Sequence, residues 1–236
     1  MINKSVHIPS CVECENKSSL FCTLDKEEKF TLSENKGQNF YKKGHVVFYE
    51  GNYANGLFCI YNGKVKLSKL GSDGKQQIFR FSKNGEILGY RALLSDEPYQ
   101  ATATAIEDSY ICHLSKDKFH SLLKKNSRLS WKTIQVLSKD LKNAEKNLMN
   151  IVQKSVKERL AEALLMLIKT FGTNENDNSL NVTLNRLELS DLVGTTSETI
   201  IRTLSDLKKN GCVELKGKKI IVINSSLLTQ MARLND

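Results

Sequence analysis

Glu198 and Arg202 are the pair of side chains whose types and spacing most directly suggest chemistry. They are four residues apart, so on a helix they lie side by side. An Arg fork matches O6 and N7 of guanine, and a carboxylate accepts a hydrogen bond from N4 of cytosine. An ordinary surface ion pair is the alternative, and the pair taken alone favours it. The neighbouring segments decide between the two interpretations.

Those segments predict two short helices joined by a glycine corner. Asn185 precedes an amphipathic helix in which Leu187, Leu189, Leu192 and Val193 are expected to point inward. Gly194 then permits the left-handed turn of an inter-helix corner, and Thr195 or Thr196 caps the second helix. That helix has one apolar face, formed by Ile200, Leu204 and Leu207. Two apolar runs after Gly211, joined by the turn at 216–219, predict a β-hairpin, so the whole is a winged helix-turn-helix.

The charge of the chain is concentrated in the same half. Residues 1–115 carry 14 Lys and Arg against 13 Asp and Glu, whereas residues 116–236 carry 21 against 13. A basic half joined to a nearly neutral half indicates a polyanionic partner for the basic half. The alternative is a Lys-rich, solvent-exposed surface without such a partner. Together with the glycine corner and the wing, the charge favours double-stranded DNA. The candidate phosphate contacts are Lys208, Lys209, Lys216, Lys218 and Lys219.

The part of the chain before the helix-turn-helix is predicted to form short strands followed by a long helix. Residues 36–115 contain β-branched and aromatic runs broken by turns such as Asn62-Gly63, which is typical of a barrel, roll or sandwich. Farther along, Ile134, Leu137, Leu141, Ala144, Leu148 and Ile151 follow spacings of 3, 4, 3, 4 and 3. This 3.5-residue period predicts a partner helix and hence a homodimer. An amphipathic helix that packs on its own domain is the alternative.

Several classes of protein are excluded by what the sequence lacks. No apolar run approaches the about 18 residues that a membrane span needs, and the N-terminal MINKSVHIPS has no apolar core of a secretory signal. We therefore expect a cytoplasmic protein whose six cysteines are reduced unless they hold a metal. The four His residues are scattered, and there is no phosphate-binding P-loop or Gly-x-Ser-x-Gly motif. We expect no enzymatic activity.

With these elements in this order, the chain resembles the CRP/FNR family of bacterial transcription regulators. The resemblance covers nearly the whole chain and is carried by LVGTTSETIIRTL at 192–204 and GKKIIV at 217–222. It implies an α+β fold with an N-terminal double-stranded β-roll of cyclic-nucleotide-binding type, a long dimerisation helix and a C-terminal winged helix-turn-helix. The corresponding segments are 1–125, 126–154 and 155–236.

The resemblance also implies how DNA is read. In this family the helix Glu and Arg recognise a TGA-type core in each half of a palindrome, a role that passes to Glu198 and Arg202. Members that sense cyclic AMP have an Arg where Ser197 stands, so the outer bases of the operator stay open. A member that activates transcription would also contact RNA polymerase. The predicted DNA contacts are Thr196, Ser197, Glu198, Ile201, Arg202, Lys208 and Lys218.

Two candidate sensor sites follow from the resemblance. The segment GEILGYRALLSDEPYQA at 85–101 resembles the family's phosphate-binding cassette, but Tyr99 and Gln100 replace the Arg and the Ser or Thr that bind a cyclic phosphate. This departure argues against cyclic AMP, so the loop either binds another ligand or simply closes the roll. The candidate pocket residues are Gly85, Glu86, Leu88, Gly89, Tyr99 and Gln100.

The second candidate site is formed by cysteines. Cys11, Cys14 and Cys22, with the distant Cys112, resemble the layout of oxygen-sensing FNR members, which hold a labile 4Fe–4S cluster. Four thiolates also suit tetrahedral zinc. The gap between Cys14 and Cys22 is longer than in FNR, so Cys22 could instead be an apolar core residue. Two functions remain: a DNA-binding regulator controlled by such a sensor, or a ligand-binding module without specific DNA recognition.

Overall fold

The computed structural model describes residues 9–16 and 19–233, so the predicted segments 1–125 and 155–236 extend slightly beyond it. The chain divides into two compact units. One comprises Met1–Lys69 with Phe79–Leu141, and the other comprises Leu70–Ile78 with Lys142–Asp236. The helix predicted at 126–154 runs through both units, and the three-part division of the chain stays a prediction.

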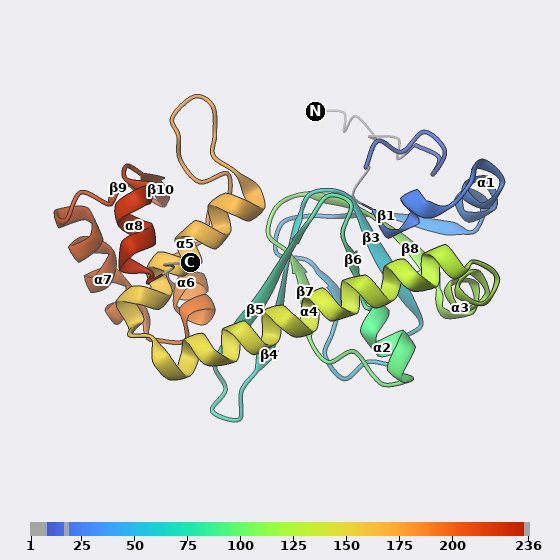
Figure 1. Ribbon diagram of the computed structural model, residues 1–236, viewed down its shortest axis with the longest axis horizontal. Helices are drawn as coiled ribbons and strands as arrows, with labels where there is room; N and C mark the ends of the chain where they lie inside the picture. The colour runs from blue at the N-terminus through green and yellow to red at the C-terminus, as the bar shows by residue number, and fades with distance from the viewer. Residues whose placement is uncertain (1–8, 17–18, 234–236) are drawn as a thin grey trace. The chain divides into compact units, whose positions relative to one another are not determined.

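Two four-stranded antiparallel sheets form the first unit (Figure 1). One has the order β1-β8-β3-β6, and the other has the order β2-β7-β4-β5. The strands are β1 (Lys36–Tyr41), β2 (Val46–Phe48), β3 (Gly56–Asn62), β4 (Lys64–Leu70), β5 (Gln76–Lys83), β6 (Ile87–Leu88), β7 (Thr102–Ala105) and β8 (Ser109–Ser115). Their inward faces share one apolar core, which includes Phe58, Ile60, Val65 and Ile111. This arrangement confirms the predicted mixed fold with a β-rich N-terminal half.

The predicted turn at Asn62-Gly63 passes the chain from one sheet to the other. Gly63 has a φ of 124°, and a Cβ at this position would meet the Ser109 hydroxyl at 2.1 Å. Glycine is therefore required both by the backbone conformation and by the close approach of β8. The short helix α2 (Tyr90–Ser95) follows β6 within the same unit.

An N-terminal segment covers the outer face of the β3–β8 sheet. It contains the short 3-10 helix η1 (Leu20–Thr23) and the helix α1 (Lys26–Glu34). Asp25 caps α1 in a reciprocal arrangement with Glu28. Leu20, Phe21 and Leu32 are buried in the same apolar cluster as the roll, so the segment is an integral layer of this unit.

After α3 (Lys116–Lys125), Asn126 leads into the long helix α4 (Ser127–Gln153). The Asn126 side chain accepts a hydrogen bond from the Leu129 amide at 2.9 Å, which caps the first turn. Farther along, Asp140 pairs with Arg80 of β5 at 2.7 Å and accepts a hydrogen bond from the Tyr90 hydroxyl of α2. These contacts attach the N-terminal part of α4 to the roll.

The second unit contains the predicted winged helix-turn-helix. Its elements are α5 (Val156–Phe171), α6 (Arg186–Val193), α7 (Ser197–Lys209), β9 (Val213–Lys216), β10 (Lys219–Val222) and α8 (Ser225–Met231). β9 and β10 pair in antiparallel register around Gly217 and Lys218. No glycine or proline separates α4 from α5. The break is instead produced by Ser155, which forms a capping box with Glu158.

Candidate DNA-contact surface and sensor pockets

The corner between α6 and α7 has the geometry that its residues require. Asn185 caps α6 together with Glu188, and Gly194 ends it with a φ of 72°. The structure selects Thr196 over Thr195 as the cap of α7, since the Thr196 hydroxyl accepts from the Thr199 amide at 3.3 Å. The recognition helix therefore starts at Ser197 with Glu198 in its first turn.

The two faces of α7 differ sharply in burial. Ile200, Leu204 and Leu207 are fully buried against the unit, as predicted. Glu198, Ile201 and Arg202 are exposed on the opposite face. Within the part of the chain that the structure describes, Glu198 and Arg202 form no ion pair with each other. This weakens the ion-pair interpretation and leaves both groups available to an external partner.

The ionisation of Glu198 suits an acceptor role. Its own backbone amide and then the Thr196 hydroxyl lower the pKa of the Glu198 carboxyl. The group is therefore a carboxylate at neutral pH, which is the form that accepts a hydrogen bond from a base amine. Ser197 is less available, because its hydroxyl lies 3.3 Å from the Ser190 hydroxyl of α6.

One inward position was predicted wrongly. Leu189 and Val193 are buried, but Leu187 is 62% exposed. Two residues along a helix correspond to a rotation of about 200°, so Leu187 lies nearly opposite Leu189. The alternation of Leu187 and Leu189 in the sequence does not by itself tell which of them faces the core.

One residue that positions the α6–α7 corner was not identified from the sequence. Arg159 of α5 donates from Nε to the Val193 carbonyl at 2.9 Å and from a terminal nitrogen to the Gly194 carbonyl at 3.3 Å. Carbonyls at a helix C-terminus lack hydrogen-bond donors within the helix. Arg159 supplies such donors at the corner that orients α7. An Arg on α5 carries no local signal of this distant role.

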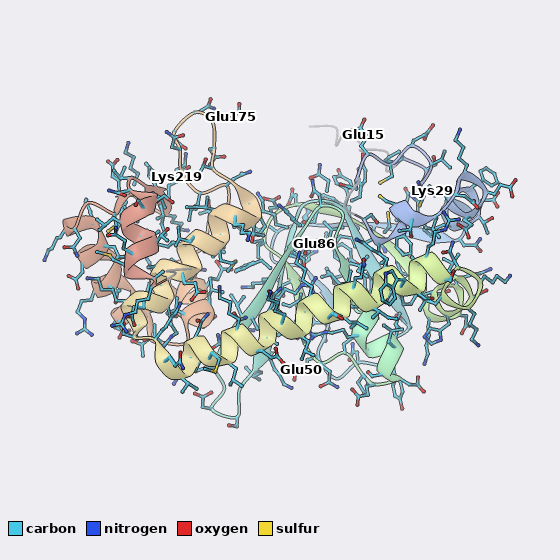
Figure 2. All side chains as sticks on the ribbon, viewed as in Figure 1. Glu15, Lys29, Glu50, Glu86, Glu175 and Lys219 are labelled. Atoms are coloured by element: carbon cyan, nitrogen blue, oxygen red, sulfur yellow. The ribbon has the colours of Figure 1, made fainter. Side chains whose placement is uncertain are left out.

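The lysines near α7 and the wing fall into two groups. Lys219, labelled in Figure 2, pairs with Asp177 at 2.6 Å, and Lys216 lies 3.8 Å from Glu214. Lys208 at the end of α7 and Lys218 at the tip of the wing are exposed. Of the five candidate lysines, Lys208, Lys209 and Lys218 are thus not engaged by Asp177 or Glu214.

An aromatic side chain of the cassette packs into the core of the roll. Leu88, Gly89, Tyr99 and Gln100 line one small pocket, but Gly85 and Glu86 lie outside its lining. The Tyr99 ring is buried and stacks on Phe48 with a centroid distance of 4.1 Å. Its hydroxyl donates to the Gly56 carbonyl at 2.6 Å. The Tyr99 side chain therefore takes up part of the space next to the cassette and lines the pocket that remains.

Two of the pocket residues outside the prediction are cationic. Arg80 and Arg91 both line this pocket. Arg80 is committed to Asp140 and lies 3.7 Å from Glu86, which is labelled in Figure 2. The pocket therefore retains positive charge without the Arg and hydroxyl positions of a cyclic-nucleotide binder.

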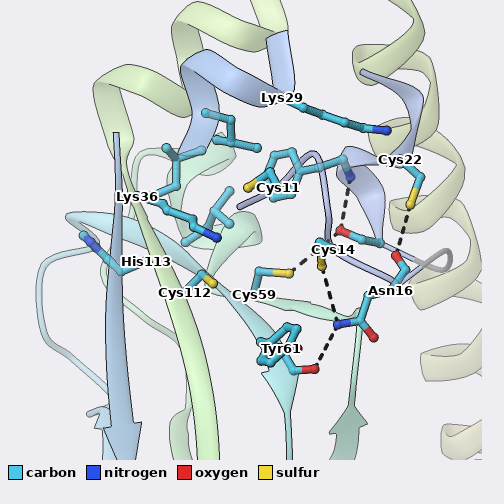
Figure 3. A pocket seen from close by; sticks show the side chains of 15 residues that line it. Cys11, Cys14, Asn16, Cys22, Lys29, Lys36, Cys59, Tyr61, Cys112 and His113 are labelled. Atoms are coloured by element: carbon cyan, nitrogen blue, oxygen red, sulfur yellow. Dashed lines mark hydrogen bonds between the residues drawn. The ribbon is translucent and has the colours of Figure 1, made fainter. Parts of the chain in front are cut away.

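A second pocket lies between the N-terminal segment and the β3–β8 sheet (Figure 3). Cys11, Cys14, Cys22 and Cys112 all line it, and so does Cys59, which the sequence reading did not include. Burial raises the pKa of Cys59 to about 12 and that of Cys112 to about 11. No set of three potential ligands in the described residues is already arranged around a single metal ion.

Comparisons with known proteins assign a domain family to each half of the chain. Residues 38–126 match the model of the cyclic nucleotide-binding domain, and residues 158–231 match that of the Crp-like helix-turn-helix domain. The chain belongs to the CRP/FNR family. It is accordingly a DNA-binding transcription regulator.

Named relatives agree with this assignment. The chain is 29% identical to the CRP-like cAMP-activated global transcriptional regulator of Mycobacterium tuberculosis, over 82% of this chain and 87% of that protein. It is 28% identical to the fumarate nitrate reduction regulatory protein of Klebsiella oxytoca, over 81% and 76%. These relatives are transcription regulators.

The fold has a solved counterpart in FixK2 from Bradyrhizobium japonicum. The TM-score is 0.73 at 24% identity, over 83% of this chain and 96% of that one. Among the described helices, none is long and apolar enough to cross a membrane.

Proposed function

We propose that this regulator acts as a homodimer that binds a palindromic, TGA-type operator under the control of its N-terminal unit. Glu198 and Arg202 read base edges, and Lys208 and Lys218 contact phosphates. The protein acts in the cytoplasm without catalytic turnover, and RNA polymerase is a further partner where it activates transcription. The observation that carries the proposal is the exposed face of α7, where Glu198 and Arg202 stand unpaired with each other above a fully buried apolar face.

The direction of the side chains supports base readout. In a docked helix-turn-helix, residues near the N-terminus of the second helix reach the bases. Glu198 is in the first turn of α7 and Arg202 is one turn later. Thr196, Ser197 and Ile201 flank them at the same end of the helix. Side chains in these positions can meet adjacent base pairs in one major groove.

An exposed apolar stripe on α4 supports the dimer. Leu141, Leu148 and Ile151 are each more than 60% exposed, and they belong to the predicted seam. Apolar side chains repeated every 3.5 residues are buried when a second helix packs on them. Two copies joined along α4 would present two α7 helices to half-sites about 34–36 Å apart.

The experiment compares Arg202→Ala with Lys218→Ala on two duplexes at one salt concentration. One duplex carries a TGA-type palindrome, and the other has the same base composition in scrambled order. Losing a bidentate contact to guanine costs about 1–3 kcal/mol per half-site, or about 5- to 140-fold. Arg202→Ala should therefore weaken binding to the palindrome alone.

Lys218→Ala is the matched control for sequence-independent binding. It should weaken binding to both duplexes equally, and it should reduce the dependence of log K on log salt by about 1 per protomer. Equal losses on both duplexes for Arg202→Ala would show that Arg202 contacts only phosphate. The proposed operator recognition would then be wrong.

A further inference from the structure

The wing places two lysines directly opposite each other. Lys216 of β9 and Lys219 of β10 are paired in the antiparallel register, on either side of the wing turn. Like charges in directly opposed positions of a sheet repel each other. Each lysine has an acidic neighbour that offsets this repulsion. A Glu214 carboxylate oxygen lies 3.8 Å from the Lys216 ammonium nitrogen. Asp177, which lies outside the wing, forms the much shorter contact of 2.6 Å with Lys219.

The Asp177 carboxylate is held in place by its own loop, which connects α5 and α6. The amide and the hydroxyl of Ser179 donate to Oδ1 of Asp177 at 3.0 Å and 2.6 Å. Lys219 donates to the other oxygen, Oδ2. The Lys219 ammonium, and then the Ser179 hydroxyl and amide, hold the pKa of the Asp177 carboxyl well below its usual range. Asp177 is therefore ionised at neutral pH, and both of its oxygens have donors.

The same loop is joined to the edge of the wing. Ser179 pairs with Ile221 of β10 in an isolated antiparallel bridge. The Leu180 amide donates to the Ile220 carbonyl at 2.9 Å. Because β9 occupies one edge of β10, these two residues of the loop line the other edge. Backbone hydrogen bonds, and not only the ion pair, therefore fix Asp177 beside the wing.

The wing turn lies next to the part of the helix-turn-helix that meets DNA. Arg186 is the first residue of α6, and its guanidinium contacts the Gly217 carbonyl of the wing turn at 3.5 Å. In a docked helix-turn-helix the first helix crosses the phosphate backbone. Lys219 is exposed and follows Gly217 by two residues. Its ammonium group is thus in the region where DNA phosphates are expected.

We propose that Asp177 competes with a DNA phosphate for Lys219 and thereby lowers the affinity of the wing for every duplex, whatever its sequence. The proposal rests on the proposed approach of the wing to the DNA backbone, and not on the reading of bases by Glu198 and Arg202. Carboxylate and phosphate oxygens both accept charge-assisted hydrogen bonds from an ammonium group. The charge of Lys219 that the carboxylate neutralises is not available to a phosphate. Asp177 therefore sets affinity and its salt dependence, and leaves sequence discrimination unchanged.

The size of the effect follows from the release of counterions by one phosphate contact. Such a contact makes the slope of log K against log salt steeper by about 0.9 for duplex DNA. Between about 1 M and about 0.1 M salt, this slope corresponds to about 8-fold in affinity. Asp177→Asn keeps the size of the side chain and an acceptor for the Ser179 amide, but it removes the charge that neutralises Lys219. We expect it to bind the scrambled duplex up to about 8-fold more tightly per protomer at about 0.1 M salt.

The experiment is a double-mutant cycle in the full chain. Wild type, Asp177→Asn, Lys219→Ala and the double variant are titrated with the scrambled and the palindromic duplex over a range of salt concentrations. Removal of one negative charge has the same long-range effect in both backgrounds, whereas release of Lys219 requires Lys219. We expect Asp177→Asn to raise affinity and salt dependence more in wild type than in Lys219→Ala, and equally on both duplexes. Equal gains in the two backgrounds would overturn the proposal, and so would the absence of any gain.

Glu175→Gln is the matched control for charge. Glu175 is exposed on the same loop, labelled in Figure 2, and it forms no ion pair within the described part of the chain. Its substitution should change affinity no more than Asp177→Asn does in the Lys219→Ala background. A gain as large as that of Asp177→Asn in wild type would also contradict the proposal.

Lys218→Ala separates this proposal from the proposed function. A reduced salt dependence in Lys218→Ala, together with no effect of Asp177→Asn, would overturn only the competition at Lys219. An unchanged salt dependence in both variants would overturn the approach of the wing to the DNA backbone as well.

Discussion

Truncation of Leu148 on α4 is the sharpest test of the dimer. The Leu148 side chain is 64% exposed in the single chain, at a seam position of the 3.5-residue repeat. Fully burying a Leu side chain is worth about 1.5–3 kcal/mol, so covering the exposed part contributes about 1–2 kcal/mol. A two-fold dimer contains the residue twice, so Leu148→Ala should cost about 2–4 kcal/mol and raise the dimer dissociation constant about 30- to 700-fold.

Met149→Ala is the matched control for this substitution. Met149 follows Leu148 on the same helix and is also largely exposed, but it lies about 100° away around the helix and off the seam. Sedimentation equilibrium measures both dissociation constants, and circular dichroism verifies that helix content is unchanged. An unchanged dissociation constant for Leu148→Ala, or equal increases for both variants, would refute the assignment of the seam.

Two further predictions concern the second unit. Arg159→Ala removes the side-chain donors to the carbonyls at the α6–α7 corner and should destabilise the unit by about 1–3 kcal/mol. Hydrogen exchange of the backbone amides at the corner should become faster. The control Lys169→Ala on the same helix should leave that exchange rate unchanged. Burial acts to raise the pKa of Glu162, but its hydrogen bonds to Lys154 and Lys146 outweigh burial and lower that pKa below 4.5. The stabilisation by Glu162 is therefore present above about pH 4.5 and is lost as the pH falls through the lowered pKa. With the exposed Lys146 screened by solvent, Glu162→Gln should lower the free energy of unfolding by about 1 kcal/mol at pH 7. The difference from wild type should shrink toward pH 3 in urea titrations, and a difference independent of pH would contradict this assignment.

The sequence alone determined those features that depend on near neighbours in the chain. Asn185 and Gly194 act within a few residues, so the cap of α6 and the corner of the helix-turn-helix follow from local chemistry. The cap of α7 was narrowed to Thr195 or Thr196, and the structure selected Thr196. The same holds for the turn at Asn62-Gly63. The helical period of α7 also separated its buried face from the exposed Glu198 and Arg202 correctly. Each of these inferences required only the geometry of one element.

Tertiary structure decided which distant residues meet. The strand register sets Cys59 opposite Cys112 across 53 positions of sequence, and the fold of the N-terminal loop turns Cys22 away from them. Leu187 and Tyr99 follow the same rule, since packing against other elements exposes the first and buries the second. Spacing along a chain specifies the faces of a helix or strand, but the partner of each face depends on long-range pairing. That pairing is stabilised by the whole core and leaves no local signal.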